Sequence, residues 1–222
     1  MSPDEQSFLS AICDRPDDDT VRLVYADWLE ESGQPARGEF IRGQVELAGL
    51  PPGTPADERR RAALFAREAE LWKAHGAKWL EPFRPYARRD SFSRGFVQRV
   101  EVPANLFLQN AERWFALTPL TRVKFTPCRV WDQVRGVYTR LRELVLADNE
   151  IGSEGARVLA GMRQLGGLES LDVRGNRITD RGARSLAQSE HLGRLRELRI
   201  TKNAIRDRNW AVLEGRFGNA LS

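Results

Sequence analysis

Few residues of this chain have types and spacings suited to catalysis or metal binding. His75 and His191 are its two histidines, and Cys13 and Cys128 are its two cysteines. None of these side chains falls at the close spacing that zinc sites use. The chain also lacks a glycine-rich phosphate loop and a nucleophile elbow. The sequence therefore predicts no catalytic residue, no metal and no cofactor, and we expect a protein that is not an enzyme.

Acidic side chains gather near the N-terminus, where they could bind a cation or a basic peptide. Asp17–Asp19 are followed by Asp27, Glu30 and Glu31. This group lacks the glycine and the downstream bidentate glutamate of a calcium-binding loop. We therefore favour a structural role, in which Asp18 and its neighbour cap a helix and the later carboxylates form ion pairs with nearby arginines.

Basic and aromatic side chains alternate along residues 82–95. Arginines mixed with Phe83, Tyr86 and Phe92 can bind phosphates and stack bases. The region Arg84–Arg99, together with the early repeats described below, therefore supports one alternative function, the binding of nucleic acid or another polyanion. The other interpretation is a loop that bridges a helical N-terminal part to the repeats, with Phe83, Tyr86 and Phe92 plugging the first repeat. We favour this second interpretation.

A pattern of apolar residues recurs at a period of 27 residues. Leu-x-x-Leu-x-Leu-x-x-Asn-x-Ile begins at Leu141 and returns at Leu168 and Leu195, with Val or Ile in place of its third Leu. Less regular copies begin at Val97 and Leu120. This is the pattern of leucine-rich repeats, in which a strand is followed by a returning segment. A helical return at this period resembles the ribonuclease-inhibitor subtype.

The repeats predict an α/β solenoid with short parallel strands on the concave side, helices on the convex side and an all-helical N-terminal cap. Ser153, Asp180 and Asp207 occupy one register and are expected to cap the helices. Where the chain leaves each strand, a polar side chain can bond backbone groups that no sheet partner satisfies. Five residues are expected to form such a ladder along the stacked units: Asn105, Cys128, Asn149, Asn176 and Asn203.

The candidate binding site is the outward face of the strands. The positions between the apolar residues point away from the core, and here they carry mixed charges with few aromatic side chains. Arginine is the one residue type among them that often dominates protein interfaces, so the face predicts a charge-complementary protein partner. The predicted contact residues are Arg99, Glu101, Arg122, Lys124, Glu143, Asp148, Asp172, Arg174, Glu197, Arg199 and Lys202.

The N-terminal part of the chain predicts four helices, the first of which begins at Ser2-Pro3. Apolar stripes predict that Val24 of the second helix and Phe65 of the fourth face the core. Residues 16–31, which read Pro-x-Asp-Asp-x-x-Arg-Leu-Val-Tyr-Ala-Asp-Trp-Leu-Glu-Glu, and residues 37–42, Arg-Gly-Glu-Phe-Ile-Arg, resemble the bacterial repeat-companion domain. The resemblance covers about residues 5–47. It implies a short module beside repeats and brings no chemistry with it.

Composition and charge limit the remaining interpretations. The chain of 222 residues is 41% hydrophobic and 30% charged, and no apolar run approaches the ~18 residues that span a bilayer. Residues 1–50 hold 11 acidic and 4 basic side chains, although the whole chain has a net charge of +4. The two distant cysteines and the acidic N-terminus favour a reduced, cytoplasmic setting.

We expect three regions: a helical repeat-companion module at 1–50, a linker with a helix and a bridging loop at 51–95, and about five repeats at 96–222. The expected protein is a monomer that binds another protein, with no membrane contact and with nucleic acid as the alternative partner. A third interpretation, regulation of a small GTPase, rests on analogy with other 27-residue repeat proteins alone.

Overall fold

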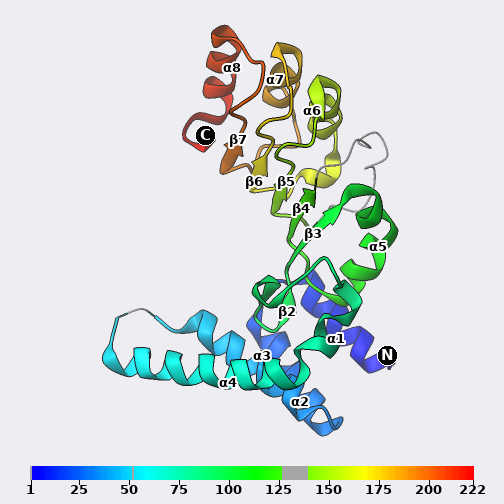
Figure 1. The fold of residues 1–222 in the computed structure, drawn as a ribbon, viewed down its shortest axis with the longest axis vertical. Helices are drawn as coiled ribbons and strands as arrows, with labels where there is room; N and C mark the ends of the chain where they lie inside the picture. Colours follow the sequence, from blue (N-terminus) through cyan, green and yellow to red (C-terminus); the bar gives the residue numbers. More distant parts are fainter. Residues whose placement is uncertain (1, 52, 127–139) are drawn as a thin grey trace. The chain divides into compact units, whose positions relative to one another are not determined.

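The computed structural model describes residues 2–51, 53–126 and 140–222. The chain divides into two compact units, whose elements are labelled in Figure 1. The N-terminal unit comprises Met1–Val100 and Arg113–Leu120, and the repeat unit comprises Glu101–Glu112 and Thr121–Ser222. In the part of the chain that the structure describes, no helix is long and apolar enough to cross a membrane.

Helices dominate the N-terminal unit, and their starts follow from the local sequence. Ser2 Oγ accepts a hydrogen bond from Glu5 N at 3.1 Å, and Pro3 opens the first helix. Thr54 caps the fourth helix in the same way, from Asp57 N at 3.1 Å. The elements of this unit are α1 (Pro3–Asp14), α2 (Asp19–Glu31), α3 (Pro35–Gly49), α4 (Pro55–Leu80), β1 (Phe92–Ser93) and β2 (Phe96–Val97).

The core of the N-terminal unit lies among α1, α2 and α3, and Phe96 of the β1–β2 hairpin belongs to it. Tyr25 and Leu29 of α2 are buried there. Val24 is 49% exposed, so the expectation that it faces the core was wrong. The buried face of α2 is centred one position away from the stripe that the apolar residues predicted, because Arg22 takes a place in it.

Arg22 is fully buried, although arginine is usually a surface residue. Its guanidinium donates hydrogen bonds to the carbonyl oxygens of Pro16, at 2.7 Å, and Asp18, at 3.0 Å. These carbonyls lie at the turn between α1 and α2, where helical partners are missing. Arg22 therefore closes the turn from inside.

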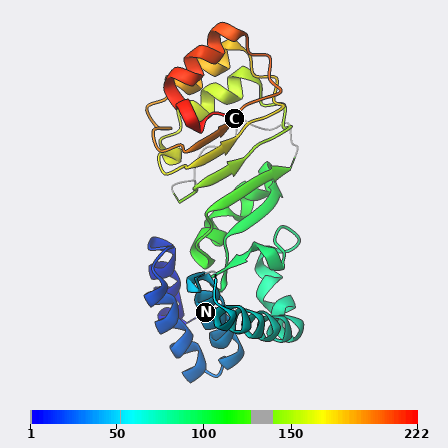
Figure 2. The same cartoon turned by 90° about the vertical axis from the view of Figure 1, so that its left-hand side faces the viewer.

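The repeats alternate strands with returning helices. Their elements are β3 (Arg99–Pro103), α5 (Ala104–Leu117), β4 (Arg122–Thr126), β5 (Glu143–Val145), α6 (Gly152–Ala160), β6 (Ser170–Asp172), α7 (Asp180–Ala187), β7 (Glu197–Arg199) and α8 (Asp207–Phe217). The strands form one sheet in the order β3-β4-β5-β6-β7. Figure 2 shows the successive strands of the repeat unit following one another in sequence order.

The pairing of the strands reproduces the sequence period. β4 to β7 are parallel, and Glu143 lies opposite Ser170, which lies opposite Glu197, 27 residues along the chain at each step. α6, α7 and α8 lie side by side in sequence order (Figure 1). Gly182 of α7 permits close packing, since a Cβ there would come within 2.9 Å of Ser153 Cα. The expected α/β repeat fold is confirmed.

Ser153 and Asp180 bond the next repeat instead of capping their own helices, so that expectation was wrong. Ser153 Oγ accepts from Thr179 N at 2.9 Å, and Asp180 Oδ1 accepts from Arg206 N at 2.9 Å. Donor and acceptor are 26 residues apart in both cases. The equivalent bonds tie the start of each helix to the segment that enters the following one.

The earliest repeat departs from the predicted form. α5 begins at Ala104, directly after β3, so Asn105 sits in the first turn of a helix and is exposed. The expectation that Asn105 belongs to the polar ladder was therefore wrong. Because β3 runs directly into α5, this repeat lacks the bend that the ladder was expected to bridge. Cys128, the next predicted ladder residue, lies outside the described residues.

Candidate partner-binding face

The predicted contact residues fall at alternate positions of the strands, as a pleated strand requires. In β4, Arg122 and Lys124 are exposed while Val123 and Phe125 between them are buried. Glu101 is exposed in β3, and Glu143, Glu197 and Arg199 are half-buried in their own strands.

Neighbouring strands carry opposite charges that meet. Lys124 Nζ lies 2.8 Å from Glu101 Oε1, and Arg122 Nε lies 3.2 Å from Glu143 Oε2. The four side chains are 35–57% exposed. Such pairs add little to stability, about 0–1 kcal/mol each, but they hold the charges in a fixed order along the face. Ser170 was not among the predicted contact residues, but its hydroxyl donates a hydrogen bond to Glu197 Oε2 at 3.0 Å.

Other pairs form between residues two positions apart in the same repeat. Arg199 Nε donates to Glu197 Oε1 at 2.8 Å. Arg174 donates to both oxygens of Asp172, with Nη2 2.6 Å from Oδ2. These hydrogen bonds to Asp172 raise the pKa of the Arg174 guanidinium.

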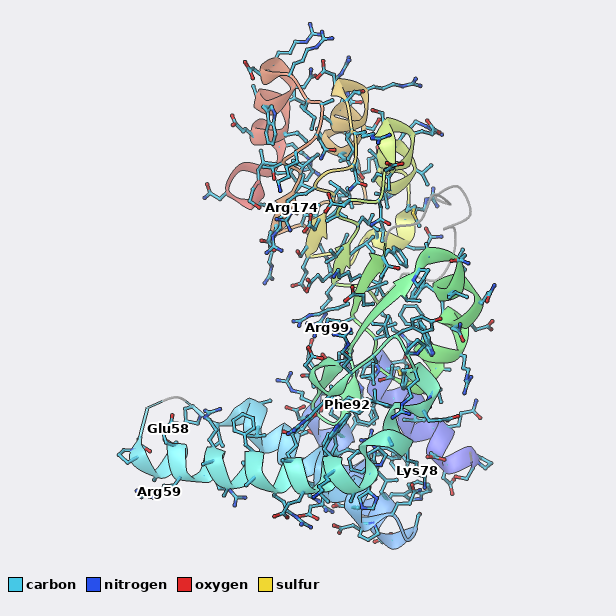
Figure 3. The ribbon with its side chains drawn as sticks, viewed as in Figure 1. Glu58, Arg59, Lys78, Phe92, Arg99 and Arg174 are labelled. Carbon is cyan, nitrogen blue, oxygen red and sulfur yellow. The ribbon has the colours of Figure 1, made fainter. Side chains whose placement is uncertain are left out.

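Asp172 is 2% exposed, so the prediction that it contacts a partner was wrong. Besides the guanidinium of Arg174, its Oδ1 accepts a hydrogen bond from the Arg174 backbone N at 3.1 Å. A carboxylate enclosed in this way holds the adjacent arginine in place. Arg174 itself remains 44% exposed on the sheet side, where Figure 3 labels it.

Asn176 joins two repeats through both ends of its amide. Its Oδ1 accepts from Asn149 N at 2.9 Å and from Ile151 N at 3.3 Å. Its Nδ2 donates to the carbonyls of Leu146, at 2.7 Å, and Arg174, at 3.0 Å. The side chain is fully buried. It therefore fixes the bend of its own repeat against the bend of the repeat before it.

Asn203 makes the same set of bonds one repeat later. Its Oδ1 accepts from the backbone N atoms of Asn176 and Ile178, both at 2.9 Å, and its Nδ2 donates to Val173 O at 2.9 Å. Asn149 Nδ2 donates to Phe125 O at 3.3 Å. Hydrogen bonds thus join the bends behind the strand face from one repeat to the next.

The residue before each of these asparagines has a left-handed backbone. Asp148 has a φ of 58°, Gly175 of 64° and Lys202 of 58°. The structure therefore places Asp148 and Lys202 at the exposed bends beyond the ends of β5 and β7, and not on the strands themselves.

Arg99 belongs to the N-terminal unit, where it forms an ion pair with Asp90. Arg89 and Arg94 of the same region also have carboxylate partners, Glu68 at 3.3 Å and Asp19 at 3.0 Å. Phe83 and Phe92 are buried. Phe92 packs against Phe40 of α3 and Trp72 of α4, so this ring lies among the helices and not in the first repeat, where we expected it.

The acidic residues near the N-terminus are also engaged. Asp18 Oδ1 caps α2 by accepting from Thr20 N at 3.0 Å. Asp27 and Glu30 both hold Arg42, with Asp27 Oδ1 2.6 Å from Arg42 Nη2. The expected structural roles of Asp18, Asp27 and Glu30 are confirmed.

The two histidines lie in different units. His75 is exposed on α4 and stacks on Trp79, with ring centroids 5.6 Å apart. His191 precedes β7, and its backbone N donates to Ser189 Oγ at 3.2 Å. Within residues 2–51, 53–126 and 140–222, no three His, Cys, Asp or Glu side chains lie close enough to hold a metal ion together.

Comparison with known proteins bears on the repeats. The chain matches no curated protein and no solved structure. The family model for the leucine-rich repeat matches residues 139–160 and 168–187. These segments contain β5 with α6 and β6 with α7, so two consecutive strand-helix units of this chain are similar to leucine-rich repeats.

Proposed function

We propose that this chain is a non-enzymatic interaction scaffold and that a partner protein docks on the outward strand face of its repeats. The observation that carries the proposal is the ordered row of paired charges on that face, from Glu101 and Lys124 to Glu197 and Arg199. The asparagine ladder behind it keeps the strands at fixed spacing. A rigid face of defined charge order recognises a partner mainly through specificity and association rate.

The finer assignments belong to the same proposal. We place a repeat-companion module at 1–50, a linker with a helix and a bridging loop at 51–95, and a solenoid of about five repeats of the ribonuclease-inhibitor type at 96–222. The family match to two of these repeats supports the scaffold role, since leucine-rich repeats commonly serve as protein-interaction modules. We propose a monomer that acts in the cytoplasm, which the two distant cysteines favour.

Nucleic-acid binding through Arg84–Arg99 is the weaker candidate. Base stacking needs accessible aromatic rings, and Phe83 and Phe92 are buried. Three arginines of this region, at positions 89, 94 and 99, already face carboxylates. Their charge is therefore partly neutralised before any phosphate approaches.

Site-specific photo-cross-linking in the source cells tests the proposed face. A benzophenone amino acid is placed at Lys124 or Glu101 on the strands, and at Arg184 on α7 as the matched helix position. All three side chains are exposed, so the substitutions should leave the fold intact. We expect one protein to be cross-linked from both strand positions. Cross-linking from the helix position alone would refute the strand face as the docking site.

A further inference from the structure

A groove of about 530 Å³ lies in the N-terminal unit between α3, α4 and the β1–β2 hairpin. Leu47, Ala48, Phe65 and Phe92 line its apolar part. Phe65 is 52% exposed, so the expectation that it faces the core of the unit was wrong. Its spacing matched a helical stripe, but that stripe on α4 borders an open groove. A large exposed ring beside a hollow is typical of a surface that a partner covers.

The tip of the hairpin forms one rim of the groove and is held in place. Arg94 and Gly95 both have positive φ, 49° and 85°, as the central residues of a tight two-residue hairpin turn require. Gly95 N donates to Gln44 Oε1 at 2.7 Å, and Arg37 donates to Gly95 O. A Cβ at Gly95 would lie 2.5 Å from Ile41 Cγ1. The turn is therefore seated on α3, and Arg94 is presented at a fixed place.

The groove carries more positive than negative charge. Its charged lining is Arg61, Arg89, Arg94, Glu68 and Asp90. Arg61 donates to the carbonyls of Leu50 and Pro51 and forms no ion pair among the described residues. Arg94 shares its carboxylate, Asp19, with the buried Arg22. Asp17 also acts on Arg22, so this cluster is close to neutral, and Arg61 supplies the uncompensated positive charge of the groove.

We propose that this groove docks an acidic peptide segment of a partner protein, with one large apolar side chain inserted beside Phe65 and flanking carboxylates facing Arg61 and Arg94. The hollow has room for an anchor of the size of phenylalanine or leucine. The excess of guanidinium groups selects carboxylates on either side of it. This surface is separate from the strand face proposed above and could serve a second partner.

The same groove suits single-stranded nucleic acid less well. A stacking platform needs rings presented in a row along a basic track. Here Phe65 is the one exposed large aromatic side chain of the described residues, and Phe92 is 9% exposed.

Fluorescence anisotropy with four defined probes tests the groove on the full-length protein. The first probe is a labelled decapeptide with a central phenylalanine between glutamates. Its matched controls replace the phenylalanine by alanine or all glutamates by glutamines. The fourth probe is a ten-nucleotide oligothymidine. We expect saturable binding of the first peptide alone, with an affinity that falls as salt is raised.

Two groove variants and two controls complete the design. Phe65→Ala should weaken binding of the first peptide at least tenfold, and Arg94→Asn about fivefold. Asn is the replacement at position 94 because it accepts the left-handed turn conformation. Arg59→Gln, at the end of α4 far from Phe92 in Figure 3, should bind as the wild type does. So should Val212→Ala, which removes another exposed apolar side chain, on α8.

Several results would overturn the proposal. One is the absence of saturable peptide binding below about 1 mM, the weakest range of specific recognition. Another is an affinity unchanged by Phe65→Ala. A third is tighter binding of oligothymidine than of the peptide, weakened by Arg94→Asn, which would assign the groove to a nucleic acid.

Discussion

At the scale of single residues, Asn176 concentrates the bonds that join two repeats. Its side chain makes four hydrogen bonds to backbone groups at 2.7–3.3 Å, and three of these four bonds are buried. Asn176→Ala should lower the free energy of unfolding by about 1–3 kcal/mol, the cost of leaving buried polar groups unpaired. Urea unfolding measures the change.

Asn105→Ala is the matched control, because Asn105 is exposed in the first turn of α5. A surface substitution of this kind changes stability by no more than about 0.5 kcal/mol. If both variants unfolded at the same urea concentration as the wild type, the ladder would not contribute to stability.

Gly95 and Gly33 allow backbone strain to be separated from crowding. Both have positive φ, 85° and 79°, but a Cβ at Gly33 would meet open space. Gly33→Ala should therefore cost about 1 kcal/mol for the strained backbone alone. Gly95→Ala should cost more, since Ile41 blocks the new methyl group. Equal losses in thermal unfolding would mean that the hairpin lifts freely from α3.

The sequence predicted the positions of the ladder asparagines but not the burial of two charged side chains. The asparagine register followed from spacing alone, because a 27-residue repeat places equivalent residues at equivalent bends. The buried Arg22 and Asp172 could not be foreseen, since charge normally indicates the surface. Their burial depends on carbonyls and a guanidinium that only the folded chain brings near them.

At the scale of elements, two ion pairs join the antiparallel helices α3 and α4. Glu39 meets Arg67 at 2.6 Å, and Glu46 meets Arg60 at 2.5 Å. Hydrogen bonds from these arginines lower the pKa of Glu39 and of Glu46 below their usual value of 4.5. The spacing is regular, since two helical turns separate the residues on each helix.

A carboxylate with a lowered pKa in the folded state stabilises the fold above its unfolded pKa, and that contribution is lost as the pH falls through the folded pKa. The free energy of unfolding should therefore decrease slightly between pH 6 and pH 3. In the double variant Glu39→Gln, Glu46→Gln this decrease should be smaller. Urea titrations at several pH values measure it.

Glu58→Gln serves as the control for acid sensitivity, because Glu58 is exposed on the same helix (Figure 3) and forms no ion pair among the described residues. Its profile should follow that of the wild type. A double variant as acid-sensitive as the wild type would mean that the two ion pairs do not set this part of the pH dependence.

Element types were more predictable than element boundaries. The period and the helix caps located α1 to α4 and the regular repeats, but α5 begins at Ala104, before Asn105, which the pattern had placed at the bend after the strand. No residue separates the end of β3 at Pro103 from the start of this helix. The groove beside Phe65 was not foreseen, since a stripe indicates an apolar face and not what covers it.

At the scale of the whole molecule, we expect a protein partner to recognise the rigid strand face by the order of its charges. Exposed pairs such as Glu101 with Lys124 contribute little to stability and can be exchanged. The double variant Glu101→Lys, Lys124→Glu keeps an ion pair in the same place but reverses the order of its charges. The fold should be unaffected, so any change in binding reports recognition.

The most direct test uses the partner protein that photo-cross-linking from position 124 identifies. The Kd of its complex is measured with the wild type and with this charge-swap variant, at two salt concentrations. We expect the variant to have an equal free energy of unfolding but a Kd raised about fivefold or more at low salt, and by less at high salt. An unchanged Kd at both salt concentrations would contradict a partner that reads the charges of the strand face.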